Sequence, residues 1–127
     1  MSAAPTVPKD ASPIVRDVIE YIEKHYAAPI SLRDVAMSLG YSPAYLTETF
    51  ARCTGKPITA WIIQRRIRAA KKLFRNSETR VASVCYSVGF NDACYFRRQF
   101  IRHVGVTPGR YRSLVTKSWP QGGRAPM

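Results

Sequence analysis

Two adjacent arginines, Arg97 and Arg98, lie between aromatic side chains in the stretch GFNDACYFRRQF. A guanidinium group presents a planar fork of N–H donors, which suits the paired acceptors of a guanine edge or the oxygens of a phosphate. If the stretch is a helix, Tyr95, Phe96 and Phe100 can face a core while both arginines project from the opposite side. The spacing therefore predicts a helix that packs on one face and offers arginine forks to an anionic partner on the other.

The charge of the chain indicates the same kind of partner. The formal net charge is +12 over 127 residues. Residues 1–50 hold four basic and six acidic side chains, whereas residues 51–127 hold sixteen basic and two acidic ones. Such a basic surface attracts DNA, RNA or an anionic membrane, and it exceeds what a small domain needs for solubility. The charge predicts a polyanion-binding protein and leaves the choice of polyanion open.

Other kinds of chemistry find little support in the sequence. There is no nucleophile paired with a base, no pair of carboxylates and no phosphate-binding loop, so we expect no enzyme activity and no cofactor. Cys53, Cys85 and Cys94 form no CxxC pair and have no histidine at metal-ligand spacing, which predicts buried thiols in a reducing cytoplasm and no metal site. The chain also has no apolar run of membrane-spanning length and no signal peptide, so we expect a cytoplasmic protein without a membrane partner.

The elements that must position the arginines are helices throughout, because apolar residues recur at helical spacing and no segment has convincing strand signals. Expected caps are Ser12-Pro13, Ser31 with Asp34, Ser42-Pro43, Asn91 and Thr107-Pro108, and expected stops are Gly40, Gly55, Gly89 and Gly105. In the third helix, Tyr45, Leu46, Thr49 and Phe50 are expected to face inward. A long fourth helix is expected from about Pro57 to Arg75.

The helical pattern occurs twice at an offset of 49 or 50 residues. The matched pairs are Gly40 with Gly89, Tyr41 with Phe90, Phe50 with Phe100, Gly55 with Gly105, and Trp61 with Tyr111. Internal similarity of this kind implies one supersecondary unit used twice. Two amphipathic helices joined by a short turn containing glycine are typical of a helix-turn-helix, whose second helix enters the major groove of DNA.

The connecting helix has a length that suits two such units on one duplex. Roughly 18 residues of helix span about 27 Å. Successive major-groove segments on one side of B-DNA are about 34 Å apart, and the packing of each unit adds to the reach. We therefore expect one chain to read two adjacent major-groove segments without dimerising.

The motifs SLRDVAMSLGYSPAYLTETF, WIIQRRIRAAKKLF and VGFNDACYFRRQF followed by GVTPGRYR resemble the DNA-binding domain of the arabinose-regulator (AraC/XylS) family of bacterial transcription regulators. The likeness covers about residues 14–112. It implies seven helices in two helix-turn-helix subdomains, and a sequence-specific transcription regulator of double-stranded DNA with recognition helices at about 42–53 and 91–103. The expected organisation is a flexible tail at 1–11, a first subdomain at 12–56, a connector helix at 57–75, a second subdomain at 76–116 and a flexible tail at 117–127.

The resemblance also implies roles for individual residues. The base-reading candidates are Ala44, Thr47, Glu48, Cys94, Arg97 and Arg98. Of the two adjacent arginines, Arg98 matches the family's common arginine and is expected at a base or a nearby phosphate, and Arg97 suits a phosphate better. The phosphate-binding candidates are Lys56, Gln64, Arg65, Arg102, Arg110 and Arg112. Glu48 either accepts from a cytosine amino group or pairs with Arg52 four residues later, and its charge predicts weaker binding by the first subdomain. Arg66 in the connector is expected to be structural.

Three alternatives remain open at this stage. A nonspecific binder of nucleoid, RNA or an anionic surface would explain the charge but not the repeated turns. A redox sensor built on Cys94 is favoured by its position near a helix N-terminus, although a small groove-facing residue is the simpler interpretation. The chain is either a complete small regulator or the C-terminal part of a longer one with an effector-binding or dimerisation domain. RNA polymerase is an expected partner in both cases.

Overall fold

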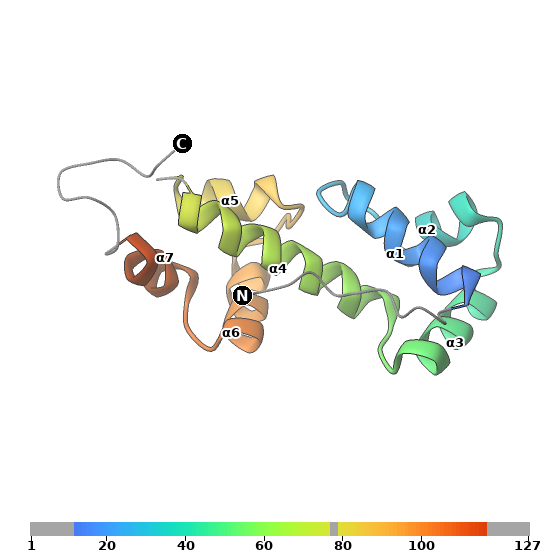
Figure 1. Cartoon of the computed structure of the whole chain (residues 1–127). Coiled ribbons are helices and arrows are strands. Elements are labelled where there is room, and N and C mark those ends of the chain that lie inside the picture. The colour runs from blue at the N-terminus through green and yellow to red at the C-terminus, as the bar shows by residue number, and fades with distance from the viewer. Residues whose placement is uncertain (1–11, 77–78, 117–127) are drawn as a thin grey trace. The chain divides into compact units, whose positions relative to one another are not determined.

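The computed structural model describes residues 12–76 and 79–116, and within them it contains seven α-helices and no strand (Figure 1). The predicted all-α fold with seven helices is therefore confirmed. The two predicted flexible tails, 1–11 and 117–127, lie outside the described residues. The helices are α1 (Pro13–His25), α2 (Leu32–Leu39), α3 (Pro43–Thr54), α4 (Ile58–Asn76), α5 (Val81–Ser87), α6 (Ala93–Val104) and α7 (Pro108–Thr116).

The chain forms two compact units that are covalently joined through α4. The first unit contains the chain up to Tyr26 and the segment Ile30–Ile62, so it comprises α1, α2, α3 and the first residues of α4. The second unit contains Ala27–Pro29 and the chain from Ile63 onward, and it comprises the rest of α4 with α5, α6 and α7. Each unit has its own hydrophobic core.

The core of the first unit is built from apolar residues at helical spacing. The buried residues of α1 pack with residues of α2, α3 and the start of α4, and they are Ile14, Val15, Val18, Ile19 and Ile22. Phe50 is fully buried and meets the edge of the Trp61 ring, with ring centroids 5.7 Å apart. Tyr45 was predicted to face inward, and this is wrong, because its side chain is 54% exposed. The buried stripe of α3 is Leu46, Thr49 and Phe50, and Tyr45 lies one helical step to its side, where it packs on Tyr41.

The core of the second unit is aromatic. Phe74, Phe96 and Phe100 are buried, and Phe100 contacts Phe74, Phe96 and Tyr111 with centroid distances of 5.9, 5.7 and 5.5 Å. The predicted burial of Tyr95 is wrong, because 37% of this residue is exposed. Its ring lies beside Phe90 at 6.1 Å, at the border between the packed and the exposed faces of α6.

The three cysteines have different settings. Cys85 is fully buried, as predicted. Cys94 is exposed, which agrees with its place among the base-reading candidates, whereas Cys53 is exposed against the expectation of a buried thiol. Cys94 lies on the face of α6 away from the buried Phe96 and Phe100. Cys53 is in phase with the buried residues of α3 but lies in the last turn of that helix, beyond the last buried position, Phe50. No described helix is both long enough and apolar enough to cross a bilayer.

Three of the five predicted side-chain caps, those of α2, α3 and α7, form as expected. Ser42 and Thr107 accept the backbone N–H groups of Tyr45 and Arg110, at 3.2 and 3.1 Å. Ser12 occupies the N-cap position of α1, but its hydroxyl makes no cap hydrogen bond. Three of the four predicted glycine stops are C-caps: Gly40, Gly55 and Gly105 end α2, α3 and α6 with φ between 79° and 96°, a region that favours glycine. The fourth, Gly89, directly follows Val88, which is the C-cap of α5.

The start of α2 is a reciprocal capping box that makes stability depend on pH. Ser31 Oγ accepts the N–H of Asp34 at 3.2 Å, and the Ser31 N–H donates to the Asp34 carboxylate at 2.8 Å. The Ser31 hydroxyl also donates to the Asp34 carboxylate at 2.9 Å. The two bonds that the carboxylate accepts, from the Ser31 backbone first and from its hydroxyl second, lower the pKa of Asp34 from its ordinary value of 3.8. Because the folded-state pKa is depressed, the contribution is fully present above the ordinary value and is lost as pH falls through the lower folded value.

We expect the unfolding free energy of the native chain to fall more steeply on acidification from about pH 5 to pH 2 than that of Asp34→Asn. The amide of Asn still accepts the Ser31 N–H but does not titrate. Urea denaturation at a series of pH values measures both slopes, and equal slopes in the two proteins would show that Asp34 contributes nothing to the pH dependence.

The cap of α6 corrects the prediction by one residue. Asp92, not Asn91, is the N-cap, and its Oδ1 accepts the N–H of Tyr95 at 2.9 Å. Asp92→Ala is expected to reduce the stability of the second unit by about 1 kcal/mol, whereas Asn91→Ala, the matched control, is expected to change it little. Urea midpoints of the two variants measure the difference, and a larger loss in the Asn91 variant would contradict the assignment.

Candidate nucleic-acid interface

The exposed face of α3 carries the three base-reading candidates of the first unit. Ala44, Thr47 and Glu48 are all exposed, while the opposite side of the helix is buried. Glu48 forms an ion pair with Arg52 at 3.8 Å, with 80% of its side chain exposed. Exposed i,i+4 pairs contribute little stability and exchange readily for another partner. This pair supports the solvated alternative for Glu48 and leaves its carboxylate accessible.

The exposed face of α6 carries the candidates of the second unit. Cys94, Arg97 and Arg98 are exposed at i, i+3 and i+4, a spacing that places them on one side of the helix. Phe96 and Phe100 occupy the packed side, as the sequence predicted. The two arginines therefore project from an aromatic-backed helix because the aromatic residues hold its other face against the core.

The guanidinium of Arg98 rests on an aromatic side chain. Its Cζ atom lies 5.7 Å from the ring centroid of Tyr95, within cation–π distance. Tyr95 in turn lies beside Phe90, and the guanidinium of Arg66 lies over the Phe90 ring at 5.7 Å. Sequence reasoning missed this role of Tyr95 because it placed the ring in the core. The usable signal was the i,i+3 spacing of Tyr95 and Arg98 on one helix.

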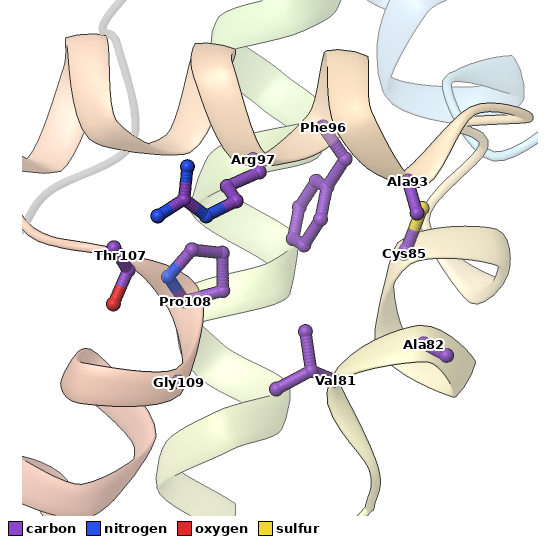
Figure 2. A pocket seen from close by; sticks show the side chains of 9 residues that line it. All are labelled: Val81, Ala82, Cys85, Ala93, Phe96, Arg97, Thr107, Pro108 and Gly109. Atoms are coloured by element: carbon purple, nitrogen blue, oxygen red, sulfur yellow. The ribbon is translucent and has the colours of Figure 1, made fainter.

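Arg97 has a different setting. Its side chain extends from α6 toward Thr107 and Pro108 at the start of α7, over a hollow between α5, α6 and α7 (Figure 2). Within the described residues Arg97 makes no hydrogen bond, ion pair or ring contact. The two adjacent arginines therefore differ in support, because Arg98 lies on a ring and Arg97 crosses an apolar hollow.

The six phosphate-binding candidates differ in accessibility. Lys56, Arg102 and Arg110 are exposed, whereas Gln64, Arg65 and Arg112 are partly buried. The backbone at Lys56 is held by its N–H, which donates to Thr54 Oγ1 at 3.3 Å. Lys56 belongs to the first unit and the other five candidates to the second. The exposed members are the ones whose charged heads can reach a phosphate without rearrangement.

Arg66 has the structural role that the sequence predicted. Its Nη2 donates to the carbonyl oxygen of Ala28 at 2.9 Å, and its guanidinium lies over Phe90. Burial lowers the pKa of Arg66, although a guanidinium remains charged at any physiological pH. Arg66 therefore joins three segments of the second unit and is not available to a ligand.

A family model described as a helix-turn-helix domain matches residues 35–113. The chain is 33% identical to the arabinose operon regulatory protein of Salmonella typhimurium over 100 residues. This match covers 78% of the chain and 36% of that protein. The chain spans 34% to 58% of the length of the first curated relatives that it matches.

Two solved structures share the fold over most of the chain. The C-terminal domain of AraT, a response regulator from Geobacillus stearothermophilus, superposes with a TM-score of 0.82 at 27% identity, covering 91% of this chain and 97% of that one. The DNA-binding domain of AdpA, a global transcriptional factor solved in complex with a target DNA, superposes with a TM-score of 0.78 at 25% identity. That match covers 87% of this chain and 100% of the AdpA chain. The chain therefore belongs to the arabinose-regulator (AraC) family of helix-turn-helix, DNA-binding transcription regulators.

Proposed function

We propose that this chain is the sequence-reading part of a transcription regulator, with α3 and α6 as recognition helices that enter adjacent major-groove segments of double-stranded DNA. Each helix has 12 residues, begins at a side-chain cap and ends at a left-handed glycine. The proposal treats 12–56 and 76–116 as helix-turn-helix subdomains joined by a connector at 57–75. The observation that carries it is the arginine pair on the exposed face of α6, opposite a buried aromatic face.

We propose that the second unit makes more of the contacts to bases than the first unit. Arg98, supported by the Tyr95 ring, donates two N–H groups to the major-groove edge of a guanine. Arg97 and Cys94 lie on the same face, and Arg97 takes a phosphate or a neighbouring base. A supported guanidinium loses less freedom on binding than one that is unsupported.

In the first unit, the proposal assigns Ala44 to a thymine methyl, Thr47 to either base type and Glu48 to a cytosine amino group. Glu48 must leave Arg52 to do so, and its charge opposes the phosphates on either side of the groove. We therefore propose that the first unit binds DNA more weakly than the second. Phosphate contacts from Lys56, Arg102 and Arg110, with Gln64, Arg65 and Arg112 contributing less, hold both helices in register.

We infer that the protein acts without catalysis, in the cytoplasm and at the nucleoid, and that RNA polymerase is its partner at the promoter. Membership of a family of transcription regulators supports this inference. Relatives longer than this chain support a separate effector-binding or dimerisation domain in the whole protein.

Selection of bound duplexes from a random pool tests the proposal. The salt concentration is held at about 150 mM, because phosphate contacts dominate affinity and depend steeply on salt. Two preferred blocks about one helical turn apart would support two recognition helices on one duplex. A pool that stays random would favour the nonspecific polyanion binder instead, with sequence preference supplied by another domain or partner.

A further inference from the structure

A hollow within the second unit lies beneath the N-terminal half of α6, between that helix, α5 and the start of α7 (Figure 2). Its volume is about 490 Å³, within the range of small-molecule sites in proteins. Val81, Ala82 and Ala93 supply its accessible apolar walls, and the buried Phe96, Pro108 and Cys85 lie beneath them. Burial raises the pKa of Cys85, so this thiol stays neutral and belongs to the apolar lining.

One charged group extends over this apolar space. Arg97 is the only charged side chain that lines the hollow, and within the described residues it has no partner. Asp92 is the single carboxylate within residues 63–76 and 79–116, and its Oδ1 is engaged with the N–H of Tyr95. Thr107 lies opposite Arg97, and its Oγ1 accepts the N–H of Arg110 at 3.1 Å, so its hydroxyl proton remains available to donate.

We propose that this hollow binds a small organic anion, with an apolar ring or short chain against Val81, Ala82 and Ala93 and a carboxylate on Arg97 and Thr107. An inorganic anion would leave the apolar walls unused, and a neutral apolar molecule would leave the guanidinium unpaired. A ligand that carries both features satisfies both halves of the site. A guanidinium binds a carboxylate through two parallel N–H donors, which gives orientation as well as affinity.

The position of Arg97 links this site to the DNA-facing surface. The same guanidinium cannot hold a carboxylate and a DNA phosphate together, so each ligand weakens the binding of the other by the same factor. This coupling rests on the proposed DNA contact of Arg97, whereas binding of the anion does not. The two parts are therefore tested separately.

The first test titrates 2-naphthoate into the DNA-free chain and follows amide chemical shifts by NMR. We expect shifts grouped around the hollow, at Val81, Phe96 and Gly109, with a dissociation constant on the order of 1 mM for an open site and a ligand of this size. Acetate, which lacks the apolar body, and 2-naphthalenemethanol, which lacks the charge, are expected to bind at least about tenfold more weakly.

Two variants and their controls localise the site. Arg97→Gln is expected to weaken the binding of 2-naphthoate about tenfold, while Arg102→Gln, five residues further along α6 and outside the lining of the hollow, is expected to leave it unchanged. Val81→Phe fills the hollow and abolishes binding, while Ser83→Phe adds the same ring outside it. The amide spectra also show whether each variant is folded. Shifts away from the hollow, or an Arg97→Gln variant that binds as the native chain does, would overturn the proposal.

The second test measures DNA affinity at fixed salt with and without saturating 2-naphthoate. A loss of affinity in the native chain that is absent in Arg97→Gln supports the coupling. If DNA affinity is unchanged when 2-naphthoate is bound, the coupling is absent, and the anion-binding site itself is not contradicted. If the chain binds no DNA sequence specifically, the proposed function is wrong. The first test then still decides whether the anion site exists, because it uses the DNA-free chain.

Discussion

Replacing Phe100 by Ala is expected to lower the unfolding free energy of the second unit by about 3–5 kcal/mol. Phe100 is fully buried, and its ring contacts Phe74, Phe96 and Tyr111, which come from α4, α6 and α7. Truncation removes the contacts that join these three helices and leaves a cavity that the remaining aromatic rings cannot fill without losing their edge-to-face geometry. A loss of this size is comparable to the total stability of many small domains, so α6 would lose its support.

Amide hydrogen exchange in α6 measures this effect residue by residue. Phe100→Leu is the matched control, because it keeps most of the apolar volume and is expected to retain most of the protection. Phe50→Ala, at the corresponding position of the repeat, is expected to have its main effect in α3, since Phe50 packs in the core of the first unit. A loss below about 1 kcal/mol in Phe100→Ala would contradict the central place of this ring in the core.

The second large effect is expected at Arg98. Arg98→Ala should remove about 1–3 kcal/mol of discrimination at one base pair of the selected site and leave preferences elsewhere in the site unchanged. Arg102→Ala is the matched control, because it removes the same charge from an exposed position of the same helix. It is expected to weaken all sequences alike and to reduce the slope of log affinity against log salt by about 1.

Variants of Tyr95 separate direct reading from support. Tyr95→Phe keeps a ring beneath the guanidinium and is expected to preserve the preferred base, whereas Tyr95→Ala should blur the preference at the position that Arg98→Ala blurs. Competition binding with single-base variants of the selected duplex measures these preferences. If Arg98→Ala weakens every duplex equally, Arg98 contacts a phosphate and the base-reading role passes to another residue of α6.

The sequence by itself determined the helices and their ends, because these depend on local chemistry. Ser31 with Asp34, Ser42 and Thr107 cap the helices at which they were expected, and Gly40, Gly55 and Gly105 end theirs. Hydrogen bonds between a cap and a backbone N–H three residues away need no tertiary contact. The repeated spacing likewise indicated one helix-turn-helix unit used twice, since a turn that requires glycine and a stripe that must be buried constrain residue types at fixed intervals.

Only the tertiary structure decided what happens at the borders of each helical stripe. Tyr45 and Tyr95 lie beside buried positions, and their exposure depends on how closely the neighbouring helix approaches. Periodicity defines the centre of a packed face, but a residue about 100° away is covered or not according to its neighbours. Arg98 and Arg97 differ in the same way. The ring under Arg98 comes from Tyr95 of the same helix, a spacing that the sequence contains, whereas only the packing of α6 with α5 and α7 places the Arg97 guanidinium over a hollow.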